Sequence, residues 1–339
     1  MRTPTRSVLV LALLGVTLAL LPACSSGSDD RLVVYSGRTE DLIGPLLEKF
    51  ADETGISIDV RYGDSADLAL TIDTEGDRSP TDVFISQSPG AVGFLDAQGR
   101  LEPLPGDVLD LVAEGNHAGD GTWVGLSGRV RVLVYNPELV PEADLPDSVL
   151  DLTDPAFEDK VALAPSNGSF IDFVTAMRKE LGEDVATGWL TGMADNGAKP
   201  YANNRAIVEA VGRGEVPMGI VNHYYNVQAK AEDPSVTSEN HYFTAEGDLG
   251  ALLIVTAASK IDTTDMEDEA ERLVEFLLTE ESQRYFAKET FEYPLIEGVD
   301  PVEGVPPIED LTVTRIDLDE LGGGLQGTQE LIADSGLAS

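Results

Sequence analysis

Short apolar runs alternate with segments of helical periodicity along most of the chain, and this alternation limits the folds that the chain can adopt. Strands are predicted at 32–35, 56–60, 83–85, 123–126, 132–135, 161–163, 216–221 and 251–256. Helices are predicted where apolar residues recur every three or four positions, at 40–53, 66–74, 170–181 and 266–279. Strands that alternate with helices indicate an α/β fold with a mostly parallel sheet.

Polar loops follow several of these strands. They are predicted at 36–39, 63–65, 86–90, 165–169 and 222–225. Ligands of open α/β sheets bind beyond the carboxyl ends of the strands. A binding site is therefore expected among these loops.

The N-terminus predicts the compartment. Residues 1–23 combine two early arginines, an apolar run and small residues before Cys24, which is typical of a secretory signal. The apolar run is shorter than the ~20 residues that span a bilayer. Cys24, the only cysteine, stands where a bacterial lipobox places its lipidated residue, and residues 24–31 are predicted to be the lipidated cysteine and a tether. A chance cysteine in an ordinary signal peptide is the alternative, but we expect an extracytoplasmic protein anchored to the cell membrane by lipid.

Composition excludes some classes of function. The formal net charge of −39 argues against nucleic acid as a partner, because phosphate contacts need Lys and Arg. After the signal, about 315 residues remain, which exceeds one typical core and suggests two lobes. The sequence has three histidines and contains no HExxH, CxxC, phosphate-binding glycine loop or GxSxG motif. We therefore predict that the protein is not an enzyme.

Two segments contain candidate binding residues. Tyr224 and Tyr225 stand together directly after a predicted strand, and phenolate oxygens suit a hard trivalent cation. Two packing aromatics, one on each side of a strand end, are the alternative. The segment Asn167-Gly168-Ser169 opens a predicted helix, where backbone N–H groups can bind an anion, and Asn204 and Asn222 can add side-chain amides. A simple helix cap is the alternative there.

Six motifs together resemble one known family. They are VVYSG at 33–37, SPTDVF at 79–84, LSGRVRV at 126–132, GEVP at 214–217, NHYY at 222–225 and EYPL at 292–295. Taken together, they make the chain similar to the periplasmic ferric iron-binding proteins of ABC transporters, the bacterial transferrin family, over nearly all of its mature length.

The resemblance implies a type II periplasmic-binding fold, with two lobes joined by crossing hinge strands near 127–135 and 249–256. The N-terminal lobe would comprise 32–130 and 255–305, and the C-terminal lobe 131–254 and 306–339. Tyr224 and Tyr225 match the family's pair of iron ligands. The family's site for a synergistic anion, carbonate or phosphate, maps onto Asn167, Gly168, Ser169, Asn204 and Asn222. The resemblance also implies an ABC permease as partner and a monomeric state.

The chain departs from the family at three positions. Where some members supply a His and a Glu from the first lobe, this chain has Thr39 and Gln87, and where others supply a further tyrosine it has Phe170. Two phenolates do not complete an octahedral shell, so anions, water or other residues must contribute. Arg38 can hold a carbonate-like anion through two nitrogens, and a salt bridge to an acid is its alternative role. The candidate substitute ligands are Tyr62, Asp64 and His223.

Three functions remain open from the sequence. The first is capture of ferric iron with carbonate or phosphate as the synergistic anion. The second keeps the fold and binds chelated iron, an organic anion or a polyamine. The third is an extracellular hydrolase or adhesion module on the same scaffold, since a fold does not fix a function.

Overall fold

The computed structural model describes residues 31–318, 321 and 324–337. The predicted signal peptide, the lipidated Cys24 and all of the tether except Arg31 lie outside the described residues. Within the described part, no helix is both long enough and apolar enough to cross a membrane.

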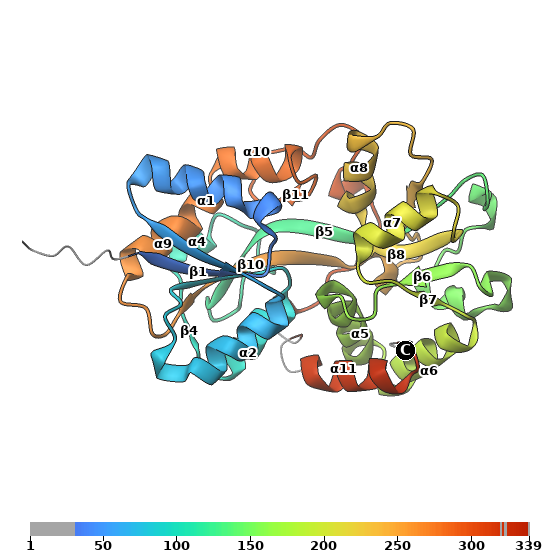
Figure 1. Ribbon diagram of the computed structural model, residues 1–339, viewed down its shortest axis with the longest axis horizontal. Helices are drawn as coiled ribbons and strands as arrows, with labels where there is room; N and C mark the ends of the chain where they lie inside the picture. The colour runs from blue at the N-terminus through green and yellow to red at the C-terminus, as the bar shows by residue number, and fades with distance from the viewer. Residues whose placement is uncertain (1–30, 319–320, 322–323, 338–339) are drawn as a thin grey trace, which may run out of the picture. The chain divides into compact units, whose positions relative to one another are not determined.

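A first group of strands contains the N-terminal part of the chain (Figure 1). Its hydrogen-bonded order is β2-β1-β3-β10-β5, made of β2 Ile58–Tyr62, β1 Leu32–Ser36, β3 Val83–Ser86, β10 Leu253–Ile261 and β5 Trp123–Tyr135. Two short strands extend it, β4 Leu101–Glu102 on β10 and β11 Tyr293–Pro294 on β5. Its helices are α1 Glu40–Thr54, α2 Ser65–Glu75, α3 Pro89–Ala97, α4 Gly106–Leu109, α9 Glu267–Leu277 and α10 Glu280–Lys288.

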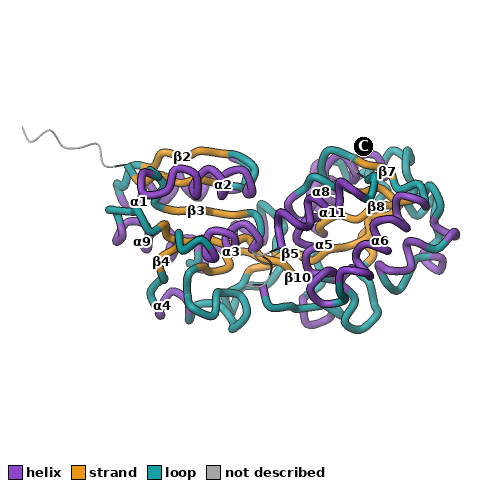
Figure 2. Tube along the Cα trace, turned by 90° about the horizontal axis from the view of Figure 1, so that it is seen from below, coloured by secondary structure: helices purple, strands orange, loops and turns teal. Residues whose placement is uncertain are grey.

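A second group continues from β5 in the order β5-β8-β6-β7. It is formed by β8 Met218–Asn222, β6 Val161–Leu163, β7 Lys199–Pro200 and, beside β5, β9 Glu239–His241. Its helices are α5 Gly168–Glu180, α6 Glu183–Asp195, α7 Asn204–Gly212, α8 His223–Glu232 and α11 Leu325–Asp334. Figure 2 shows β7 and β8 among α5, α6, α8 and α11.

The strand β5 belongs to both groups. Its first part pairs with β10, ending at Val130 opposite Leu253, and its second part pairs with β8, beginning at Arg131 opposite Asn222. We predicted two strands separated by a polar stretch at 127–131, and this prediction is wrong, because β5 runs unbroken through it. Every residue of β5 is buried, arginines included, and Arg129 and Arg131 hydrogen-bond to the Thr256 hydroxyl and the Ser169 carbonyl inside the protein.

The prediction of a mostly parallel sheet is also wrong. Pairs β1–β2, β1–β3, β6–β7 and β6–β8 are parallel, but all pairs made by β5 or β10 are antiparallel. Two long crossing strands that run against their neighbours produce a mixed sheet. The prediction of an α/β fold itself is confirmed.

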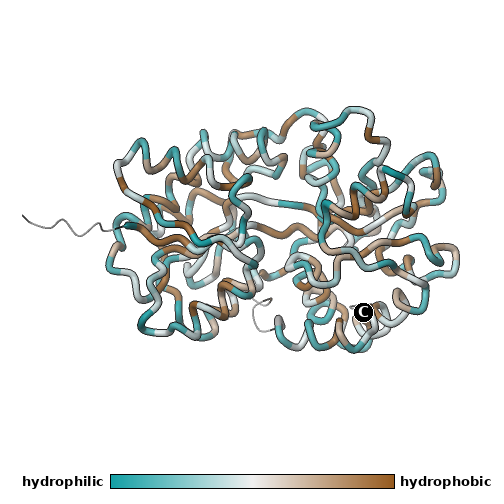
Figure 3. Tube along the Cα trace, in the orientation of Figure 1, coloured by the Kyte–Doolittle hydropathy of each residue, from teal (hydrophilic) through white to brown (hydrophobic). Residues whose placement is uncertain are grey.

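Local sequence explains the boundaries of the elements. The helix α1 buries Ile43, Leu47 and Phe50 on one face and ends at Gly55, whose φ of 74° is left-handed and favours glycine. The two long strands β5 and β10 are buried along their whole length. In Figure 3 hydrophobic stretches of the trace lie on both sides of the structure. The core contains these two strands together with the buried faces of helices and strands in both groups.

Candidate functional site

The paired tyrosines lie in the first turn of a helix. We expected 222–225 to be a loop, but only Asn222 is extended, and α8 begins at His223. The ring of Tyr224 is fully buried and stacks on the half-buried ring of Tyr225, with 4.2 Å between centroids and 28° between planes. The two rings therefore lie on the same side, which differs from packing on opposite sides of a strand end.

Burial sets the acidity of Tyr224. Loss of water raises the pKa of its hydroxyl well above the ordinary value, and the neighbouring Tyr225 and Glu292 raise the pKa further. Arg38 and Arg129 oppose this and lower the pKa. A neutral phenol is therefore favoured until a cation replaces its proton.

Three charged side chains from distant segments meet beside Tyr224. The Arg38 guanidinium donates two hydrogen bonds to Glu292, of 2.7 Å from Nη1 and 2.6 Å from Nη2, and both side chains are fully buried. Arg129 Nη1 donates to the Thr256 hydroxyl at 2.7 Å and lies 3.7 Å from the Glu292 carboxylate. Although burial alone raises the pKa of Glu292, the two guanidiniums outweigh it and hold this pKa below its usual value. Arg38 thus has a bidentate partner within the protein, and an anion held in the same way would need the same two nitrogens.

His223 already uses both ring nitrogens. Its Nδ1 accepts a hydrogen bond from the Val130 backbone N–H at 3.2 Å, and its Nε2 lies 2.9 Å from the Phe291 carbonyl, to which it donates. Burial lowers the pKa of the ring to about 4. A neutral His223 therefore joins α8 to β5, and it would have to give up a bond to act as a ligand.

Gln87 reaches the tyrosines from the first group of strands. Its backbone N–H donates to the Ser65 hydroxyl at 3.0 Å, and its Nε2 donates to the Tyr224 hydroxyl at 3.4 Å. Thr39, in contrast, is the exposed N-cap of α1. Phe170 is buried with its ring 5.9 Å from that of Phe173. Of these three departures from the family pattern, Gln87 is the one that contacts the tyrosine pair.

The predicted anion residues come together at the start of α5. Asn167 Oδ1 accepts from the Ser169 backbone N–H at 3.2 Å and from the Ser169 hydroxyl at 2.6 Å. The amide of Asn204 lies 3.5 Å from the same oxygen, and Asn222 Nδ2 donates to the Ser169 hydroxyl at 3.2 Å. Among the described residues, Asn222 Oδ1 is buried without a hydrogen-bond partner. At Gly168 no atom lies within 4 Å of where a Cβ would stand, so the turn is open on that side.

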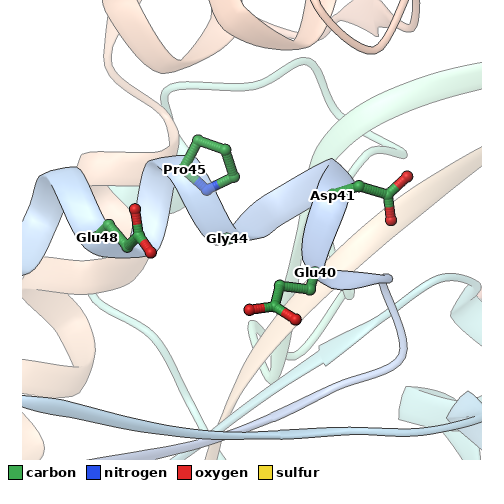
Figure 4. Close-up of a pocket in the computed structure, with 5 residues that line it drawn as sticks. All are labelled: Glu40, Asp41, Gly44, Pro45 and Glu48. Carbon is green, nitrogen blue, oxygen red and sulfur yellow. The ribbon is translucent and has the colours of Figure 1, made fainter.

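Two other candidate ligands lie at separate positions. Asp64 caps α2, where its Oδ1 accepts from the Ala66 N–H at 3.0 Å. Burial raises the pKa of Tyr62, and the nearby Glu40 and Glu48 raise it further, which places this phenol beside α1. The same two carboxylates, with Asp41, Gly44 and Pro45, line a surface hollow on α1 (Figure 4). In the described part of the chain, no group of three His, Cys, Asp or Glu side chains could hold a metal ion.

Sequence patterns did not single out Arg129 or Glu292 as site residues. Arg129 stands in a stretch that is otherwise mostly apolar, and charges inside a buried strand are an available signal for a buried network. The partnership of Arg38 with Glu292 spans 254 positions, which no local pattern reveals.

Comparison with known proteins gives consistent matches. The model of the bacterial extracellular solute-binding protein family matches residues 78–321. The major ferric iron-binding protein of Neisseria meningitidis serogroup A is 33% identical over 93% of this chain and 94% of its own. The Fe(3+)-binding periplasmic protein of Serratia marcescens is 28% identical over 96% of this chain and 97% of its own. The crystal structure of iron-bound HitA from Pseudomonas aeruginosa is similar with a TM-score of 0.86 and 34% identity, covering 91% of this chain and 99% of its own.

Proposed function

The chain belongs to the family of bacterial extracellular solute-binding proteins, and from this membership we propose that it captures ferric iron outside the cytoplasm and delivers it to an ABC importer. The family consists of solute-binding transport proteins, so no catalytic step is assigned. The relatives named above for ferric iron match the chain over nearly its whole length, which supports iron as the cargo.

The stacked pair Tyr224 and Tyr225 is the observation that carries the proposal. Two phenols that begin one helix can present both oxygens to one cation. Ferric iron is hard and strongly charged, and it displaces the phenolic protons that burial otherwise retains. Arg38 and Arg129 lower the pKa of Tyr224 and so assist the loss of its proton.

The remaining coordination positions are proposed to come from Gln87 and a synergistic anion. A half-turn of the Gln87 amide exchanges Nε2 for Oε1 and presents a carbonyl oxygen beside Tyr224. The cluster of Asn167, Ser169, Asn204 and Asn222, with the open turn at Gly168, suits carbonate or phosphate, because it combines amides, a hydroxyl and a helix start. Arg38 stays a prediction as an anion ligand, one that requires it to release Glu292.

A ferric citrate titration followed by visible absorption tests the proposal, with and without bicarbonate or phosphate. We expect a phenolate-to-iron band that saturates at one iron per chain and is lost when Tyr224→Phe and Tyr225→Phe are combined. Tyr135→Phe is the matched control, since Tyr135 is also buried but ends β5 beside Glu142 and Glu239. A wild-type protein without this band, and with a melting temperature raised by an organic anion or a polyamine instead, would support the alternative ligand class.

The proposal also covers the division into lobes and the lipid anchor. We propose that the lobes divide as 32–130 with 255–305 and 131–254 with 306–339. The first boundary is supported by the change of partner along β5 between Val130 and Arg131. We further propose that residues 1–23 are removed, that Cys24 is lipidated and that the protein works as a monomer. Mass spectrometry of the membrane-extracted protein, in which a Cys24→Ser variant should lose the diacyl mass, tests the anchor.

A further inference from the structure

Outside the tyrosine site, one acidic side chain joins the two groups of strands. Asp172 lies on α5, in the second group, and its carboxylate faces the start of α3, which packs on β3 and β10 in the first group. The Ser88 side chain and the Gly90 backbone of that start lie close to it, and both lower the pKa of Asp172. Asp172 is therefore a contact between the two proposed lobes, separate from the residues assigned to iron or the anion.

The contact is tight at Gly90. A Cβ placed there would stand 2.4 Å from Asp172 Oδ1, and the next nearest atoms are also those of Asp172. Since Gly90 lies in a helix with negative φ, only this carboxylate makes the position unsuitable for alanine. A side chain at position 90 would therefore collide with Asp172.

The Asp172 carboxylate is not fully hydrogen-bonded in this position. Asp172 is 2% exposed, and its Oδ2 has no hydrogen-bond partner among the described residues. An ionised carboxylate that is removed from water and incompletely bonded costs more free energy than its neutral form.

The charged groups that face Asp172 come from β5. They are Arg129 and Arg131, and neither forms an ion pair within 4.0 Å with it among the described residues. Three other elements pack on α5: α11 through the hydroxyls of Thr328 and Thr175, α6 through the Trp189 ring, and the short helix Leu249–Ala251, whose cap Asp248 is bonded to Ser148 and Val149. Partial compensation by two arginines therefore leaves the ionised carboxylate less favourable here than in water.

We propose that Asp172 is a positioning residue that opposes closure of the two lobes while it is ionised, and that it thereby speeds release of the bound ligand. The proposal rests on the proposed function for the movement of lobes around a cargo. A transport protein has to surrender its cargo, and a buried charge at the lobe contact keeps the closed state from becoming too stable.

The direction of the pH effect follows from linkage. Burial raises the pKa of Asp172 to about 6 in the contact, although Ser88, Arg129, Arg131 and Gly90 each lower it. When the lobes separate and water returns, this pKa falls towards its ordinary value. Closure then takes up a proton. It therefore becomes more favourable as the pH falls through about 6, and this gain is lost as the pH rises through the same range.

Two variants test the proposal from opposite sides. Asp172→Asn keeps the shape and removes the charge, and we expect release of iron to a chelator at pH 7.5 to slow about tenfold, equivalent to about 1.4 kcal/mol. Gly90→Ala inserts a methyl against the carboxylate, and release should accelerate about tenfold.

A double variant and a control complete the test. Adding Asp172→Ala to Gly90→Ala should restore slow release, since the clash is removed. Gly188→Ala, on α6 with no atom within 4 Å of the new methyl, is the control and should release iron as the wild type does.

A measurement without iron separates this inference from the proposed function. The radius of gyration from small-angle scattering should decrease between pH 7.5 and 5.5 for the wild type and stay constant for Asp172→Asn. If the wild type forms no iron band but shows this difference, iron capture is wrong and the role of Asp172 stands. If Asp172→Asn releases iron as fast as the wild type, or if both proteins respond equally to pH, the role of Asp172 is wrong.

Discussion

Replacing Glu292 by Gln should destabilise the protein far more than a change of surface charge does. The carboxylate binds both terminal nitrogens of Arg38, at 2.7 and 2.6 Å, with neither side chain exposed. It is also the acid nearest Arg129, at 3.7 Å. A neutral amide leaves these two buried guanidiniums without a counter-charge, and breaking a buried pair from one side costs about 3–5 kcal/mol. For roughly 300 folded residues this corresponds to a fall of about 5–8 °C in the melting temperature.

Calorimetry of the iron-free protein at pH 7.5 measures this loss. Glu281→Gln is the matched control, because Glu281 forms an ion pair with Lys49 at the surface, where its side chain is 68% exposed. Such surface pairs contribute about 0–1 kcal/mol. Equal melting temperatures for Glu292→Gln and Glu281→Gln would refute the view that the buried network holds the crossing strands to the segments that carry Arg38 and Glu292.

Further predictions concern the site and the core. Gln87→Glu should add a charged oxygen beside Tyr224 and tighten iron binding about tenfold or more, as measured by competition with citrate; unchanged affinity would mean that position 87 does not reach the metal. Asn222→Ala should weaken the dependence of the iron band on bicarbonate or phosphate while the band itself persists, and a full loss of the band would place Asn222 in the metal shell instead. Gly219→Ala should destabilise by about 1–3 kcal/mol in urea unfolding, since its Cβ would stand 2.3 Å from Ile207 in the packed core, and a neutral result would show that α7 yields easily.

The candidate site was partly readable from local pattern. The tyrosine pair and the segment 167–169 follow predicted strands, and in the structure Asn167, Ser169, Asn204 and Asn222 form one hydrogen-bonded cluster. Gln87 could not be assigned in this way, because Gln87 and Tyr224 are 137 positions apart in the sequence. Their contact depends on how the two groups of strands meet. The helical setting of Tyr224 was missed for the opposite reason: a short polar and aromatic segment has little periodicity of its own.

The sequence by itself determined the α/β class, most strands and four of the helices, and it supplied the candidate residues for iron and an anion. Hydrophobic periodicity and helix-ending glycines such as Gly55 act over a few neighbouring positions, so they can be read along the chain. Only the tertiary structure decided that β5 runs unbroken through its arginines, that Arg38 meets Glu292, and that Asp172 meets Gly90. Each of these depends on burial and on partners far away in sequence, because a charge is stable inside a protein only when distant segments supply its counter-charge and hydrogen bonds.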